Sequence, residues 1–158
     1  MLARLFPKAA GNAEYRGWRA GIWLMVPVAA LRLVEGINSI LSTRQVAMTA
    51  DGIPLDTYGP AGAAAVISLF ALGGLALVLT ALLAAAVLIR YRGLIPFTYV
   101  LLLLDVLGTK WLLIVHPIAR AGAAKIGAFS IGALMNWGII AVIVLGLAFS
   151  LLSRRSAP

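Results

Sequence analysis

The amino-acid sequence predicts an all-α integral membrane protein, a bundle of four transmembrane helices in one domain over residues 1–158. Hydrophobic residues make up 63% of the chain and charged residues only 11%, whereas a typical soluble domain has about 25% charged residues. The mean hydropathy is +1.04. A soluble fold of this length has too little interior to bury so much apolar surface, but a bilayer accepts it. In addition, four apolar stretches each reach the ~20 residues that a helix needs to cross about 30 Å of hydrocarbon.

The four apolar stretches cover residues 20–41, 62–89, 94–115 and 127–152. Helices are expected in all four, because backbone groups that face lipid must form their hydrogen bonds within the segment. Residues 90–93 form a short basic turn between the second and third stretches. So short a connection makes these two helices antiparallel neighbours.

A longer polar loop, residues 42–61, joins the first and second stretches. Within it, Asp51-Gly52 is a turn sequence that separates residues 45–48 from residues 55–58. These flanking segments have the spacing to pair as a short β-hairpin.

The distribution of basic residues predicts the orientation. If the N-terminus is cytoplasmic, that side carries Arg4, Lys8, Arg16, Arg19, Arg90, Arg92, Arg154 and Arg155, whereas the other side carries only Arg44, Arg120 and Lys125. Lys and Arg are in excess in cytoplasmic loops. Both termini are therefore expected in the cytoplasm, with the longer loop on the outer side.

Four charged residues interrupt the apolar stretches: Arg32 and Glu35 in the first, and Asp105 and Lys110 in the third. Each costs about 2.5–3.5 kcal/mol at a helix centre, so we expect them to be paired. Arg32 and Asp105 both fall near the midplane, and Glu35 and Lys110 lie about 4.5 and 7.5 Å further toward the outer face. Matching depths predicts the pairs Arg32–Asp105 and Glu35–Lys110. The alternative is Arg32–Glu35, because residues i and i+3 share a helix face.

Further polar residues fall at similar depths, namely Asn38, Ser39, Thr109 and Asn136. With the charges they predict a polar pocket in the outer half of the bundle. Two interpretations stay open: an ion-pair network that fixes helix register, or a site that binds or transports a ligand. An intramembrane charge is by default a candidate functional residue.

Other residue types narrow the chemistry. The chain has no cysteine and one histidine, His116, so thiolate metal sites and an intrachain bis-histidine haem are excluded. No nucleophile-elbow motif is present. We therefore expect no enzyme activity, no cofactor and no metal. The net charge of +8 comes from basic residues at the ends of the apolar stretches, which predicts contact with lipid headgroups rather than with nucleic acid.

Two stretches resemble known bacterial membrane proteins. Residues 31–36, Leu-Arg-Leu-Val-Glu-Gly, together with the polar loop and the short basic turn, resemble the DoxX-like family of small four-helix membrane proteins. Residues 90–96, Arg-Tyr-Arg-Gly-Leu-Ile-Pro, resemble a stretch of uncharacterised inner-membrane proteins. These resemblances imply a multi-pass protein of a bacterial-type inner membrane and no particular activity. The redox roles suggested for DoxX-like proteins transfer poorly to a chain without cysteine.

These observations favour a non-enzymatic accessory or scaffold subunit, in contact with the bilayer and with other membrane subunits or copies of itself. The alternative is an oligomeric transporter or channel for a small solute or protons, with Asp105 or Glu35 as the working carboxylate. A membrane oxidoreductase or cofactor-carrying subunit is the least favoured.

Overall fold

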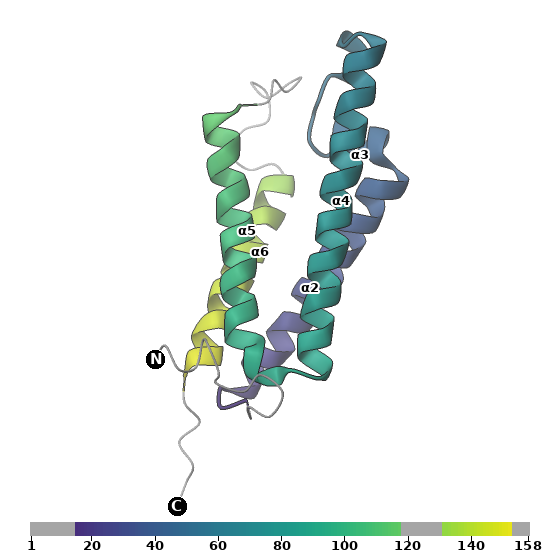
Figure 1. Ribbon diagram of the computed structural model, residues 1–158. Helices are drawn as coiled ribbons and strands as arrows, with labels where there is room; N and C mark the ends of the chain where they lie inside the picture. The colour runs from purple at the N-terminus through teal and green to yellow at the C-terminus, as the bar shows by residue number, and fades with distance from the viewer. Residues whose placement is uncertain (1–14, 118–130, 153–158) are drawn as a thin grey trace, which may run out of the picture.

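The computed structural model describes residues 15–117 and 131–152, with the side chains of the second segment from Asn136 onward. Within these residues all regular structure is helical, as predicted, and there is no strand (Figure 1). The elements are α2 (Arg19–Leu41), α3 (Thr43–Thr49), η1 (Leu55–Thr57), α4 (Pro60–Ile89), η2 (Arg92–Leu94), α5 (Ile95–Val115) and α6 (Ile131–Leu151). The helices begin and end close to the predicted bounds, except that residues 127–130 of the predicted fourth stretch lie outside the described residues.

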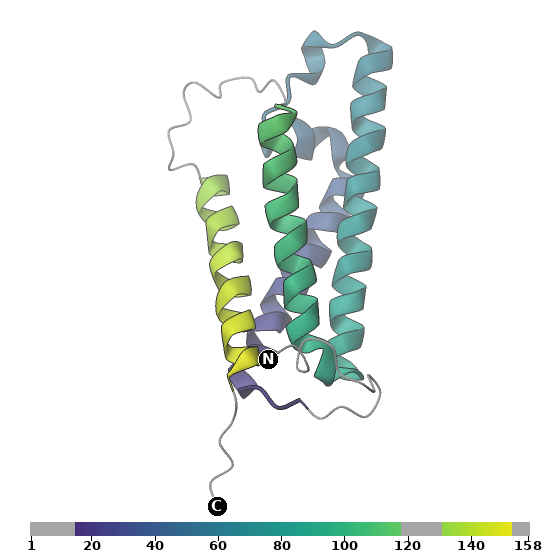
Figure 2. The same cartoon turned by 60° about the vertical axis from the view of Figure 1, so that its left-hand side comes forward.

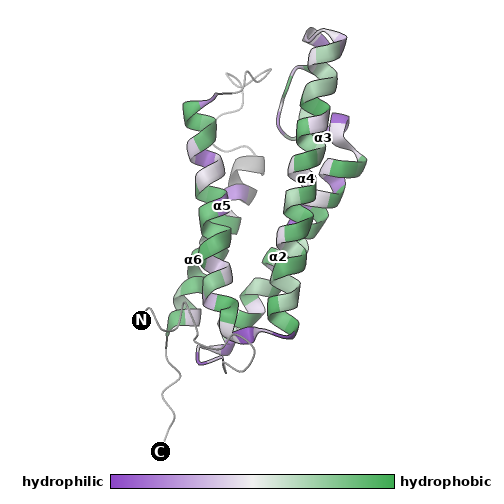
Figure 3. Ribbon diagram, in the orientation of Figure 1, coloured by the Kyte–Doolittle hydropathy of each residue, from purple (hydrophilic) through white to green (hydrophobic). Residues whose placement is uncertain are grey.

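Three helical segments are long and apolar enough to cross a membrane: Arg19–Leu41, Pro60–Ile89 and Arg92–Val115. The part of α6 with described side chains, Asn136–Leu151, is apolar but shorter. In Figure 3 the hydrophobic colour runs along most of the length of the helices. On α4, Leu69 and Leu72 are 67% and 61% exposed. Such an outward apolar surface indicates a membrane protein.

The expected hairpin in the loop after α2 is wrong, because residues 45–48 belong to α3 and residues 55–57 form η1. The turn itself is present, and Gly52 has a φ of 67°. Instead of pairing two strands, it folds the chain back onto α3, where the Ile53 N–H donates to the Ala47 carbonyl over 2.9 Å. This arrangement buries Ala47, Ile53 and Leu55 beside α4. The turn therefore does not join two strands. It directs Ile53 and Leu55 toward α3 and α4, where both side chains are buried.

The helices associate unequally. α2 packs mainly against α4 and secondarily against α6, and α5 packs against α6. α2 and α5 make only slight contact. Figures 1 and 2 show the same arrangement from two directions, with α5 and α4 joined at one end by η2.

The end of the bundle that contains η2, here called the closed end, holds the main apolar core. This core consists of Met25, Val28, Val87, Ile95, Tyr99, Leu102, Val106 and Ile143. The Tyr99 hydroxyl donates to the Gly21 carbonyl over 2.7 Å, which ties α5 to α2. A Cβ at Gly146 of α6 would overlap the Tyr99 ring, so only glycine leaves room for it.

The start of α2 and the end of α6 meet at the same end. The Trp18 N–H donates to the Phe149 carbonyl over 3.0 Å, and the two rings stack with centroids 5.9 Å apart. The Tyr15 hydroxyl donates to the Trp18 carbonyl over 2.8 Å. Burial raises the pKa of Tyr15 to about 12, so this hydroxyl keeps its proton near neutral pH.

A close crossing joins α2 to α4 further along. A Cβ at Gly36 would lie 2.7 Å from the Gly74 carbonyl oxygen, and a Cβ at Gly74 would lie 2.8 Å from the Ser39 Cβ. Small residues allow membrane helices to approach this closely. At this crossing the α2 backbone next to Glu35 lies against α4. The contact holds in place the part of α2 that carries Arg32 and Glu35.

Candidate functional site

The Arg32 guanidinium is the centre of the charges within the apolar helices α2 and α5. Its Nη2 lies 3.1 Å from Asp105 Oδ2, and its Nη1 lies 3.5 Å from Glu35 Oε2. The Arg32 side chain is only 12% exposed, against 44% for Asp105 and 38% for Glu35. Because α2 and α5 otherwise barely touch, this pair is a main link between them in this part of the bundle.

The Arg32–Asp105 pair expected from depth is present, and so is the alternative Arg32–Glu35 pair. The expected Glu35–Lys110 pair is not present. The Lys110 ammonium instead lies 4.8 Å from the ring centroid of Trp137 on α6. Five residues along a helix turn the side chain direction by about 140°. Asp105 therefore faces α2 while Lys110 faces α6, although both lie at depths that match α2 residues.

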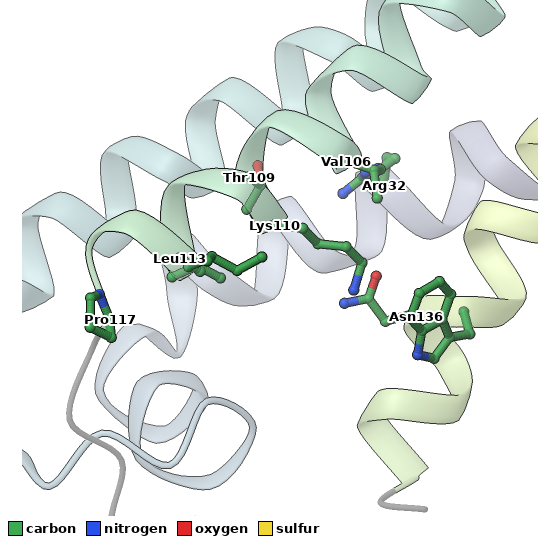
Figure 4. Close-up of a pocket in the computed structure, with 9 residues that line it drawn as sticks. Arg32, Val106, Thr109, Lys110, Leu113, Pro117 and Asn136 are labelled. Atoms are coloured by element: carbon green, nitrogen blue, oxygen red, sulfur yellow. The ribbon is translucent and has the colours of Figure 1, made fainter. Parts of the chain in front are cut away.

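A cavity of about 610 Å³ lies where Lys110 projects, and we call it the cationic cavity (Figure 4). Its polar lining consists of Arg32 from α2, Thr109 and Lys110 from α5, and Asn136 from α6. Its apolar lining consists of Val106, Leu113, Ile114, Pro117 and Trp137. In Figure 4 Lys110 extends from α5 toward Asn136. Among the described residues, two cations and no acid line this cavity.

A second cavity of about 420 Å³ lies between α2, α4 and α5, and we call it the acidic cavity. Asp51 and Asp105 line it, along with Ser39 and Thr80. Arg32 and Thr109 contribute to both cavities. Each cavity thus carries a different sign of charge, and the Arg32 side chain is common to the two.

Three of the four uncharged polar residues predicted for the pocket line one or both of these cavities. Ser39 lines the acidic cavity, Asn136 the cationic cavity and Thr109 both. Asn38 is exposed and lines neither, because it lies on the outward side of α2. Trp137 was missed by sequence reasoning. Its position beside Asn136 in an apolar helix, at the depth of Lys110, is the pattern that could have identified it.

The site can bind by charge and hydrogen bonding. Among the described residues no group of three His, Cys, Asp or Glu could hold a metal ion. Arg32 Nε is buried without a hydrogen-bond partner in the described part of the chain. The arrangement therefore offers one partly unsatisfied buried guanidinium, an ammonium that faces a cavity, and amide and hydroxyl groups beside them.

Comparison with protein-family models, with curated proteins and with solved structures finds no match.

Proposed function

We propose that the chain is a four-helix, multi-pass protein of a bacterial-type inner membrane with both termini in the cytoplasm. The closed end carries Arg19, Arg90 and Arg92, whereas the described loop at the opposite end carries only Arg44. This asymmetry agrees with the excess of basic residues on the cytoplasmic side of membrane proteins.

The proposed orientation can be tested by cysteine labelling, because the chain has no cysteine of its own. A membrane-impermeant maleimide applied to intact cells should modify Arg44→Cys and leave Arg92→Cys unmodified. Labelling of Arg92→Cys in intact cells, with Arg44→Cys protected, would reverse the orientation. Permeabilised cells supply the control that both positions are reactive.

Within this membrane placement we propose a non-enzymatic role as an accessory or scaffold subunit. The observation that supports it is the use of both intramembrane carboxylates by one buried guanidinium, Arg32. Charges that neutralise each other across α2 and α5 suit a fixed helix arrangement. A carrier of protons instead needs a carboxylate that is free to gain and lose its proton.

A photo-crosslinking amino acid at Leu72 or Leu79 of α4 tests the subunit role, since these side chains are 61% and 58% exposed. An accessory subunit should form a protein adduct of one defined mass in native membranes. The same probe at Ala81, which is 3% exposed, is the matched control and should form none. Adducts with lipid alone, together with a monomer after mild solubilisation, would contradict the subunit role.

The second candidate function is transport or channelling of a small solute by an oligomer. The cationic cavity favours it, because Lys110 and Asn136 line an accessible space rather than a packed interface. Asp105→Asn should then abolish solute-dependent or pH-dependent flux in proteoliposomes while the protein stays folded. Unchanged flux in this variant would rule out a carrier that depends on Asp105.

A further inference from the structure

Lys110 holds a charge in an otherwise apolar part of α5, with little compensation from the described residues. No carboxylate of the described residues lies within ion-pair distance of its ammonium, which instead lies over the Trp137 ring. A cation–π contact offsets only part of the cost of removing an ammonium from water. The ammonium therefore has capacity to bind an anion.

The four acids that the structure describes all lie away from Lys110. The sequence has five, of which Glu35 and Asp105 pair with Arg32, and Asp56 pairs with Arg44 over 2.8 Å. Asp51 lines the acidic cavity, and Glu14 lies outside the described residues. None of the four described acids lines the cationic cavity. An anion that compensates Lys110 in this cavity would thus come from outside the described part of the chain.

The lining matches an anion with several acceptor oxygens. Lys110, Asn136 and Thr109 offer an ammonium, an amide and a hydroxyl as hydrogen-bond donors, from two helices. Hydrogen bonds from a charged donor to an anion are among the strongest that proteins make. Beside these donors, Leu113 and Ile114 form an apolar wall. The volume of about 610 Å³ is within the range of ligand sites in proteins.

We propose that the cationic cavity binds a phosphate group, with Lys110 as the principal ligand and Asn136 and Thr109 as neutral donors. The phosphate belongs either to the headgroup of an anionic lipid, whose chain would lie along the apolar wall, or to a soluble phosphate. The proposal depends on the membrane placement proposed above, and it holds for an accessory subunit as well as for a transporter.

The test measures binding from both sources with the purified full-length protein in a neutral maltoside detergent. Native mass spectrometry records retention of added phosphatidylglycerol, with phosphatidylcholine as the uncharged comparison. Tryptophan fluorescence records binding of inorganic phosphate, because Trp137 lies in the cavity. Trp137→Phe should remove that fluorescence response.

Lys110→Gln should reduce binding about tenfold or more, as expected for loss of a charge-assisted contact. Lys110→Arg should retain binding. Arg44→Gln is the matched control, because Arg44 is an exposed cation outside the cavity. Circular dichroism and a monodisperse elution profile establish that each variant is folded. If Lys110→Gln does not fold, Asn136→Leu replaces it and should also weaken binding.

Retention of phosphatidylglycerol that is lost in Lys110→Gln would support the site with a lipid as the source. A fluorescence response to inorganic phosphate alone, lost in the same variant, would support it with a soluble source. Absence of both forms of binding, or equal binding by wild type and Lys110→Gln, would overturn the proposal. Labelling of Arg44→Cys and crosslinking from α4 report separately on the proposed membrane placement and subunit role, so those results distinguish their failure from failure of this site.

Discussion

At the closed end of the bundle, α2, α5 and α6 meet in direct apolar contact around Tyr99, which is fully buried. Further along the same helices, α2 and α5 are linked by the Arg32–Asp105 ion pair, with a cavity on either side of it. The first region is held by close packing and one buried hydrogen bond. The second region is held by charges at a depth where most neighbouring side chains are apolar.

This contrast indicates a division of roles within one short chain. Packing around a glycine and an aromatic ring fixes how the helices meet at the closed end. A charged link between separated helices leaves space on both sides and provides groups that can bind. A region that combines accessible volume with intramembrane charge is where we expect function, and the closed end is where we expect stability.

The largest expected effect follows from removing the centre of the charged region. Arg32→Met leaves Glu35 and Asp105 without their counter-charge, and Asp105 then shares its cavity with a second acid, Asp51. Loss of one partner of a buried ion pair costs about 3–5 kcal/mol, so we expect a large fall in the free energy of unfolding, measured in detergent by denaturant titration. A change below about 1 kcal/mol would mean that water or lipid already neutralises these acids.

The closed end should respond to added volume. Gly146→Leu places a side chain in the space that the Tyr99 ring occupies, and overpacking of this kind costs about 1–3 kcal/mol. Gly138→Leu on the same helix is the control, because a Cβ there meets nothing within 4 Å. Equal stability of the two variants in a thermal unfolding assay would show that the closed end is loosely packed.

A smaller effect is expected from the hydrogen bond between α5 and α2. Tyr99→Phe keeps the ring and removes the hydroxyl that donates to Gly21. The expected loss is about 0.5–1.5 kcal/mol, because the Gly21 carbonyl loses the hydroxyl but keeps its backbone donor within α2. The free energy of unfolding measured beside Tyr91→Phe, an exposed tyrosine, checks whether the effect depends on burial.

The smallest effect is expected in the loop after α2. Asp56→Asn breaks the 2.8 Å ion pair with Arg44, in which the two side chains are 65% and 62% exposed. Exposed pairs contribute about 0–1 kcal/mol, and added salt should reduce even this difference. A loss comparable to that of Arg32→Met would remove the distinction between intramembrane and loop charges.

The sequence predicted the features that depend on helix length and depth. Apolar runs of sufficient length gave the bounds of α2, α4 and α5 closely, and equal depth on parallel helices gave the Arg32–Asp105 pair. The depth of a residue along its helix does not specify the direction in which its side chain projects. For that reason the predicted pairing of Glu35 with Lys110 was wrong. The prediction that Asn38 lines the polar pocket was wrong for the same reason.

In the loop after α2, the sequence predicted the turn but not the secondary structure on either side of it. Asp51-Gly52 marks a change of chain direction, and that change is present at Gly52. A turn sequence does not specify what lies on either side of it. Burial of Ala47 and Leu55 near α4 favours a helix, and that tertiary contact is not visible in the local sequence.

Exchange of the two charges tests whether the Arg32–Asp105 pair joins α2 to α5. Glu35 would repel an aspartate at position 32, so the exchange is made in a Glu35→Gln background. Arg32→Asp and Asp105→Arg should each lower the free energy of unfolding in that background, and the double exchange should restore most of the loss. A double variant no more stable than either single variant would contradict such a link.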